Sequence, residues 1–285
     1  MRSMLVVLLV LAFVPTAAPS RFEWDGPRFD GAPMIRLSYG FAERSHDDLE
    51  GELADPVAIE LELGSAHWSD AASGIVDYTS NGVSFSYSGS DLGGGDDEDK
   101  AFETEAWAVG LFSYTGIGYR IRASALTPYS GGRLGFYRLG YDREVMTGAE
   151  EVSGELSDED FRRLGFFHEE FRLATSAEGG VRARIGPMVE VGLGYERMTV
   201  MQRWLPWKWL GSVMTEALAQ EALDEFIGAI RDRTPAAAPI VAFVLKNGLS
   251  YGIYELRQED MNWPFGDAPP LAQDTFKLSV SFAFR

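Results

Sequence analysis

The 285-residue chain has no cysteine, only three histidines and a deficit of basic side chains. Without cysteine it can form neither a disulfide framework nor a thiolate metal site, and it has no thiol nucleophile. Its 25 Lys and Arg against 43 Asp and Glu give a formal net charge of −18. Nucleic acid is therefore not expected as a partner, because binding it requires a basic footprint. The 46% hydrophobic content is ordinary for a folded chain and argues against disorder.

Long hydrophobic runs are also scarce. Met4–Val14 is uncharged, follows Arg2, and precedes the small residues Ala17 and Ala18. This order predicts a secretory signal peptide over residues 1–20, with an uncleaved N-terminal anchor as the alternative. The run is too short to cross a bilayer, which needs about 20 residues. No later segment has 18 consecutive apolar residues, so the sequence predicts no membrane-spanning helix and a single domain over 21–285.

What the remaining chain does contain is alternation with a period of two, the pattern of β-strands. One early face carries Ile35, Leu37, Tyr39 and Phe41, and the final block carries Phe276, Leu278, Val280, Phe282 and Phe284. Similar blocks occupy 57–64, 83–88, 107–111, 117–124, 181–185 and 189–195. Further strands are expected at 132–142, 165–175 and 249–257.

Glycine-containing pairs and triplets between the blocks predict turns. They are Thr115-Gly116, Ser130-Gly131-Gly132 and Glu178-Gly179-Gly180. Asn81-Gly82 is compatible with a tight hairpin or a bulge, because the apolar positions change parity there. The strand count is therefore predicted only as about ten, within a range of 8 to 12.

Alternation fits either a soluble β-protein with its apolar face inside or a membrane barrel with that face toward lipid. Two features favour the membrane barrel. Charged residues occur in mid-strand while the opposite face stays apolar, and aromatic residues suited to bilayer interfaces lie near block ends. These aromatic residues are Trp68, Tyr87, Trp107, Tyr114, Tyr141 and Tyr195.

Together with the signal sequence and a last strand carrying Phe282 and Phe284, these blocks resemble a bacterial outer-membrane β-barrel protein at the level of the class. The resemblance covers most of residues 33–285. It implies an all-β, antiparallel, up-and-down transmembrane barrel in the outer membrane, a lipid and lipopolysaccharide environment, and insertion by the barrel-assembly machinery. In that class the aromatic residue usually ends the chain, whereas Arg285 follows here. A monomer is expected.

The non-lipid faces of the predicted strands carry charges of both signs. This candidate lumen network comprises Arg36, Glu60, Glu62, Arg120, Arg122, Arg182, Arg184 and Glu190. In a narrow barrel these charges would pair and close the interior, because an unpaired buried charge is costly. In a wider barrel they would line a wet channel. Eight to ten strands leave little room, which favours the closed interior.

One stretch, 203–247, breaks the alternation and predicts a helical insertion. Its apolar stripe changes side near residues 219–221, so the helix either breaks there or meets different surroundings along its length. In a barrel it could plug the lumen, lie at the interface or cap one end. Elsewhere, Ser157 to Asp160 forms a capping box ahead of a short helix ending at Gly165.

Catalytic chemistry has little support in the sequence. His67 and His168 are weak candidates for a general base, without a GxSxG or HExxH motif. The acidic loops 43–55 and 91–105 lack the spacing of an EF-hand, so no metal and no cofactor is expected. The sequence thus favours a passive small pore or carrier, or a structural envelope barrel. The alternatives are a lipid-modifying enzyme and a soluble periplasmic binder of an apolar ligand.

Overall fold

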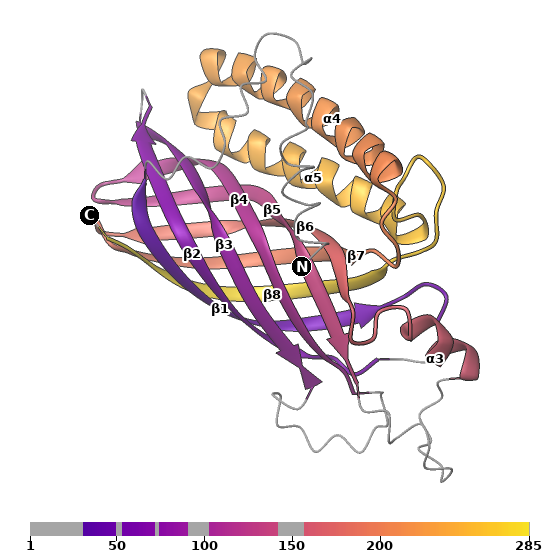
Figure 1. The fold of residues 1–285 in the computed structure, drawn as a ribbon. Helices are drawn as coiled ribbons and strands as arrows, with labels where there is room; N and C mark the ends of the chain where they lie inside the picture. The colour runs from indigo at the N-terminus through magenta and orange to yellow at the C-terminus, as the bar shows by residue number, and fades with distance from the viewer. Residues whose placement is uncertain (1–30, 50–52, 72–73, 91–102, 142–156, 285) are drawn as a thin grey trace.

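The protein is a closed barrel of eight antiparallel strands. The computed structural model describes residues 31–49, 53–71, 74–90, 103–141 and 157–284, so the predicted signal peptide lies outside the described residues. Each strand pairs with the next, and β8 pairs with β1 to close the ladder (Figure 1). The strands are β1 (Ala32–Ser45), β2 (Val57–Asp70), β3 (Ile75–Gly89), β4 (Glu105–Ile121), β5 (Ser124–Gly140), β6 (Phe171–Ile185), β7 (Val189–Val200) and β8 (Leu271–Ala283). The predicted up-and-down barrel is confirmed at the lower end of its strand range.

The two ends of the barrel differ in the length of their connections. At the turn end, the short connections 71–74, 122–123 and 186–188 join strands, and here β1 also begins and β8 ends. At the loop end, the strands are joined by 46–56, 90–104, 141–170 and 201–270. Helix α3 (Asp158–Leu164) lies at the loop end (Figure 1). This asymmetry is typical of outer-membrane barrels, whose periplasmic turns are short.

Helix α3 has the predicted start and end. The Ser157 hydroxyl accepts a hydrogen bond from the Asp160 amide, and the Asp160 carboxylate accepts one from the Ser157 amide. The helix ends at Gly165. Leu164 and Phe167 then pack with Tyr137, Leu139 and Leu271 at the mouth of the barrel, in a cluster that we call the loop-end plug.

The barrel has the polarity opposite to that of a soluble barrel. On β1, Leu37 and Phe41 point outward and are 58% and 64% exposed, whereas the neighbouring residue Arg36 points inward and is 2% exposed. The register continues this pattern around the wall, because Leu37 lies beside Leu61 of β2 and Val280 of β8. An apolar outer wall around a charged interior is the arrangement that a bilayer requires of a β-barrel.

The predicted glycine turns are wrong. Strands β4, β5 and β6 run without a break through the three sites, and β3 runs through Asn81-Gly82 with no bulge. The glycines instead make room inside the barrel. A Cβ on Gly131 would lie 2.8 Å from Cδ1 of Tyr114, and a Cβ on Gly180 would lie 2.8 Å from Cε1 of Tyr129.

The predicted aromatic belt is only partly confirmed. Trp107 and Tyr195 lie on the outer wall, and the Tyr87 ring packs 4.6 Å from that of Trp107. Tyr114 and Tyr141 are buried inside, and Trp68 packs on the buried ring of Tyr78. The apparent parity change in β3 has the same cause, because its turn-end half carries apolar residues on the inner face.

The helical insertion is confirmed but is longer than predicted. Helix α4 (Pro206–Arg233), the short η3 (Pro235–Ala237) and helix α5 (Ala238–Glu259) connect β7 to β8. The strand expected at 249–257 is therefore wrong, since these residues belong to α5. Helix α4 is unbroken at 219–221, so the shift of its apolar stripe reflects different surroundings along its length.

The helical hairpin, defined as α4, η3 and α5, lies against the outside of the barrel wall. Helix α5 packs on β4, β5, β6 and β7, and Figure 1 shows both helices beside the barrel. Near the turn end the Tyr119 hydroxyl donates to the Ala236 carbonyl (2.6 Å), and near the loop end the Tyr254 hydroxyl donates to Asp274 (2.6 Å). The hairpin thus spans the height of the wall and does not plug the lumen.

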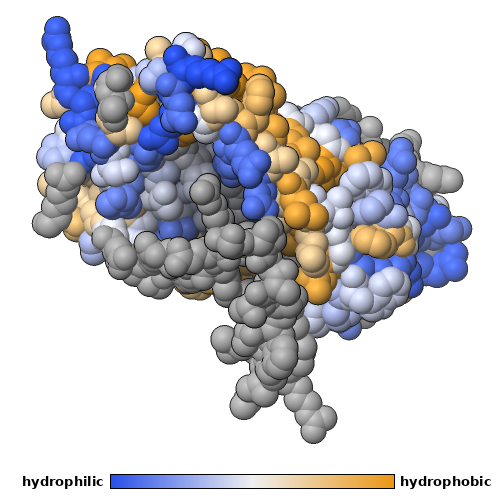
Figure 2. Space-filling model, turned by 90° about the horizontal axis from the view of Figure 1, so that it is seen from above, coloured by the Kyte–Doolittle hydropathy of each residue, from blue (hydrophilic) through white to orange (hydrophobic). Residues whose placement is uncertain are grey.

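The outer side of the hairpin carries many apolar side chains. On α5 these include Ile240, Val244 and Leu256, which are exposed. Among the described residues, one helical segment, 235–259, is long and apolar enough to cross a membrane, with a mean hydropathy of 1.3. Figure 2 shows apolar residues over the middle of this face and hydrophilic residues toward the ends.

The role of the strand glycines is testable with Gly131→Ala. The added methyl would collide with the Ser113 carbonyl and the Tyr114 ring, and such overpacking costs about 1–3 kcal/mol. We expect a lower urea midpoint for the refolded protein. The control is Gly228→Ala in α4, where a Cβ meets nothing within 4 Å; it should leave stability unchanged or raise it by up to about 1 kcal/mol. Equal midpoints for the two variants would contradict the packing role.

Candidate functional site

The candidate site is the interior of the barrel, where charged side chains from six strands meet. Alternation within each strand places every second residue inside, so the inward set is determined by register. The lumen network, as the structure defines it, contains four cations and five carboxylates that are largely or fully buried. Its members are Arg36, Glu60, Glu62, Arg133, Glu178, Arg182, Glu190, Glu196 and Lys277.

The half of the network nearer the turn end is organised by two arginines. Arg36 pairs with Glu62, donates to the Tyr78 hydroxyl at 2.9 Å, and reaches Glu190 at 3.4 Å. Arg182 donates to the same Tyr78 hydroxyl. Its guanidinium also lies over the Tyr129 ring, 3.8 Å from the centroid. A cation on an aromatic face is stabilised by the ring quadrupole, and Glu178 and Glu190 lie 3.8 Å and 3.9 Å from the same guanidinium.

The half nearer the loop end is organised by Lys277 and Arg133. The Lys277 ammonium lies 3.0 Å from Glu60, 3.1 Å from Glu178 and 2.6 Å from Glu196. Arg133 pairs with Glu60 and Glu196. Each buried cation here has at least two carboxylate partners, which offsets the loss of hydration that makes isolated buried charges costly.

Tyr114 links the two halves. Its hydroxyl lies 2.9 Å from Glu62 and 3.1 Å from Glu178, and its side chain is fully buried. The ring also stacks on Phe112 and meets Tyr129 edge-on. A large rigid ring therefore stands across the middle of the lumen.

Apolar layers close the network at both ends. From the middle of the barrel toward the turn end, Met34, Ala66, Tyr78, Phe112, Tyr114 and Tyr129 form one cluster, whose tyrosine hydroxyls contact the lumen network. Toward the loop end, Leu53, Tyr137, Leu139, Leu164, Phe167, Val200 and Leu271 belong to another. Beside that second cluster, Arg44 donates to the Ser88 and Thr104 carbonyls and to Gln273. The interior is thus a stack of apolar, charged and apolar layers.

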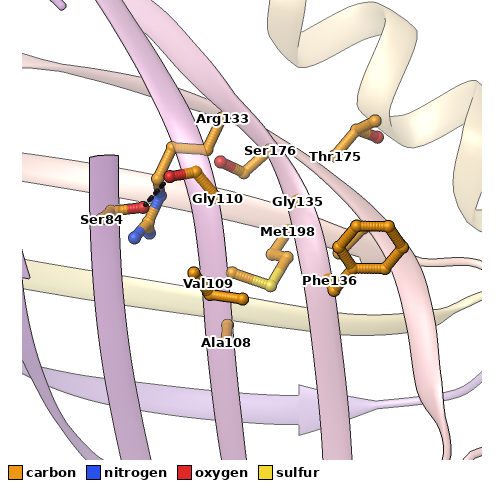
Figure 3. A pocket seen from close by; sticks show the side chains of 11 residues that line it. Ser84, Ala108, Val109, Gly110, Arg133, Gly135, Phe136, Thr175, Ser176 and Met198 are labelled. Carbon is orange, nitrogen blue, oxygen red and sulfur yellow. Dashed lines mark hydrogen bonds between the residues drawn. The ribbon is translucent and has the colours of Figure 1, made fainter. Parts of the chain in front are cut away.

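Little space remains inside this stack. A cavity of about 10 Å³ lies beside Glu60, Arg133 and Lys277. A second, of about 20 Å³, lies between β4, β5 and β6 (Figure 3), where the Ser84 hydroxyl donates to the Gly110 carbonyl at 3.4 Å. A single water needs about 10–15 Å³. Each of these two cavities therefore holds one or two waters at most, far less than a channel through the described part of the barrel would need.

The structure brings together five of the eight predicted network residues. Arg36, Glu60, Glu62, Arg182 and Glu190 are all buried in the lumen. Arg184 lies at the turn-end mouth, where it donates to the Pro187 carbonyl and covers the Trp68 ring at 4.4 Å. It is a rim residue.

Arg120 and Arg122 do not reach the network, and their inclusion is corrected. Arg120 pairs with Asp70 at the turn end, where the side chains are 46% and 62% exposed. Arg122 lies in the turn between β4 and β5 with φ of 59° and is exposed. The inward face of β4 is uncharged at mid-height, because Phe112 and Tyr114 occupy it.

Four network members were missed by sequence reasoning. Arg133 and Glu178 adjoin the glycines that were assigned to turns, and Glu196 lies beyond the block that ended at Tyr195. Lys277 alternates with Phe276 and Leu278 in the final block but is not among the charges grouped from the sequence. A continuous parity count through the glycines would have found all four.

The candidate histidines lie at opposite ends of the barrel. His67 is exposed on the outer side of β2 near the turn end. His168 is buried at the loop end, where its ring lies 3.9 Å from that of Tyr141. The structure therefore does not combine them in one site. Within the described ranges, no three His, Asp or Glu side chains converge as metal ligands.

No family model and no curated protein matches the sequence. Among solved structures, Neisserial surface protein A is similar over 88% of this chain and 97% of that one, with 9% identity and a TM-score of 0.42. Ail, the attachment invasion locus protein of Yersinia pestis, is similar over 89% of this chain and 99% of that one, with 9% identity and a TM-score of 0.32. A structure of the Yersinia pestis outer membrane protein Ail in a phospholipid bilayer nanodisc covers 61% of this chain and 92% of that one, with 15% identity and a TM-score of 0.24.

The chain resembles outer-membrane β-barrel proteins in fold class. At these identities the likeness concerns the fold alone. Placement and function are therefore inferred from this chain's own outer wall and interior.

The pairing within the network predicts a large loss of stability for Arg133→Met. The variant leaves Glu60 and Glu196 with fewer partners in a buried setting, and breaking such a pair costs about 3–5 kcal/mol. The matched control is Arg120→Met, whose pair with Asp70 is exposed and contributes at most about 1 kcal/mol. Urea unfolding in detergent, followed by tryptophan fluorescence, measures both. A loss of stability in Arg133→Met as small as that in Arg120→Met would indicate a hydrated interior.

The loop-end plug is expected to loosen in acid. Burial lowers the pKa of His46 despite the neighbouring Asp48 and Asp47, and its ring packs edge-on against Phe167 at 6.0 Å. A lowered pKa in the folded state means that the neutral ring is favoured. Its contribution is therefore present above the ordinary pKa of about 6.5 and is lost as the pH falls below it.

Hydrogen exchange of Phe167 and its neighbours at neutral pH and at about pH 5 tests this expectation. Exchange should increase in acid for the natural chain, and His46→Asn should abolish most of the difference. The control His67→Asn changes an exposed histidine and should keep the difference. Equal exchange at the two pH values would contradict the role of His46.

Proposed function

We propose that the protein is a non-conducting outer-membrane barrel, a structural anchor of the envelope that holds a helical hairpin at its outer wall. The observation that carries this proposal is the layered interior, in which the lumen network lies between two apolar clusters and the cavities hold one or two waters at most. An eight-stranded barrel is only wide enough to be filled by its own side chains. A passive pore would need a continuous wet path.

The outer wall supports placement in a lipid bilayer. Large side chains such as Leu37, Phe41, Phe276 and Leu278 are about half exposed or more and form a belt around β8, β1 and β2. In water this surface would far exceed the apolar patches that monomeric soluble proteins tolerate. This argues against a soluble periplasmic binder, which would place its apolar face inside.

The two ends support an orientation. We place the turn end, with both ends of the barrel chain, on the periplasmic side, and the loop end with α3 outside. Lipid and lipopolysaccharide are then the surrounding partners. Phe282 and Phe284 on the outer side of the last strand support recognition by the barrel-assembly machinery.

Single-channel recording in planar bilayers tests the proposal. The purified, folded chain should give no conductance steps, while a 16-stranded porin inserted in the same way conducts and serves as the positive control. A chain lacking residues 206–259 should also stay silent, because the hairpin lies outside the lumen. Reproducible steps from the full chain would overturn the closed-barrel proposal, and steps only after deletion would restore a gating role for the hairpin.

A further inference from the structure

The hairpin lies beside an unusual part of the barrel wall. On β1, β2, β7 and β8 the outward residues at mid-height are large and apolar, but on β3, β4 and β5 several are small and polar. This polar wall patch consists of Thr79, Asn81, Ser113, Thr115 and Ser130. Ser113 is the central residue of β4, so the patch faces the bilayer interior, where exposed polar groups are costly.

A pocket lies between this patch and the hairpin. Its volume is about 190 Å³, and its wall side includes the hydroxyl-bearing residues Thr79, Thr115 and Ser130. On the hairpin side it is lined by Phe243, Lys246 and Asp224. Nearby, Asn247 donates to the Tyr129 carbonyl at 3.4 Å, and Gly179 has no side chain that would displace it. These contacts hold α5 close to the wall and bound the pocket.

The charges of this pocket differ from those of the lumen. Lys246 pairs with Asp224 at 2.5 Å, with side chains 20% and 55% exposed. At the turn-end side of the pocket, Asp77 pairs with Arg231 at 2.7 Å. Within the described structure Lys246 has this one carboxylate partner, whereas Lys277 in the lumen has three. An ammonium group has three donors, so Lys246 has capacity for a further anion.

The position of the pocket indicates the kind of ligand. Its wall residues belong to the beginning of β3, the end of β4 and the beginning of β5, which all lie in the turn-end half of the barrel. Headgroups of the leaflet that faces the turn end therefore lie nearest. Ionisable residues within a membrane usually pair or mark a binding site.

We propose that the pocket binds the headgroup of a zwitterionic phospholipid. The phosphate accepts hydrogen bonds from the Lys246 ammonium and the wall hydroxyls, while the amino group of the headgroup donates to Asp224 and Asp77. The pocket offers both signs of charge and neutral hydroxyls, which match such a headgroup better than a purely anionic one. The acyl chains extend along the apolar outer wall. This inference depends on the bilayer placement but not on the closed lumen, so it can fail independently of the conductance test.

Native mass spectrometry of the detergent-solubilised full chain tests the inference. We expect one phosphatidylethanolamine to be retained, phosphatidylglycerol to be retained less, and diacylglycerol not to be retained. Lys246→Met should weaken the apparent affinity for phosphatidylethanolamine by about tenfold or more, because it removes a charge-assisted hydrogen bond to the phosphate. The control Lys208→Met removes a cation beside the Gly266 carbonyl, outside the pocket, and should leave occupancy unchanged.

Two further measurements keep the inference falsifiable if Lys246→Met does not fold. Asp224→Asn should reduce the preference for phosphatidylethanolamine over phosphatidylglycerol. The double variant Thr115→Val with Ser130→Ala should reduce the retention of both lipids. Equal retention of diacylglycerol, or unchanged occupancy in every variant, would overturn the site. Retention of added inorganic phosphate without any lipid would overturn the assignment to a lipid headgroup.

Discussion

The pairing of buried charges inside the barrel is the constraint on which the rest of the structure depends. A bilayer demands an apolar outer wall, and strand alternation then turns the charged residues at mid-height inward. Within an eight-stranded barrel those inward charges cannot remain hydrated, so each must find partners across the lumen. Lys277 with its three carboxylates and Arg36 with Glu62, Glu190 and Tyr78 satisfy this demand. A closed interior is its consequence.

The tyrosines and glycines follow from the same demand. Tyr114 and Tyr129 supply hydroxyls to the carboxylates and ring faces to Arg182, but their rings extend over the paired position on the neighbouring strand, which is Gly131 for Tyr114 and Gly180 for Tyr129. Gly131 and Gly180 provide the missing space. These strand glycines therefore serve packing inside the barrel and do not form turns.

The helical hairpin lies beside the polar wall patch, where the outward residues of the barrel are less apolar than a lipid-facing wall requires. Thr115 and Ser130 line the pocket beside α5, where Ser130 is partly buried and Thr115 stays exposed. The hairpin brings its own Lys246 and Asp224 into the membrane region. Charge thus appears on both sides of the same wall. Inside the barrel, each charged side chain is buried beside side chains of opposite charge. Outside, the charged side chains are partly exposed. This difference in burial separates a structural network from a candidate binding site.

The sequence alone determined the fold class, because alternation at positions such as Ile35–Phe41 and Phe276–Phe284 depends only on the two-residue period of a strand. It also determined most lumen charges and the capping box at Ser157. It did not determine the strand count, because a glycine pair in the sequence can mark a turn or can lie within a strand, packed against an aromatic ring of the neighbouring strand. The exclusion of Arg120, the inclusion of Arg133 and the position of α5 were decided only by the tertiary structure. Register and strand tilt set which inward residues share a height, and these arise from closure of the whole barrel.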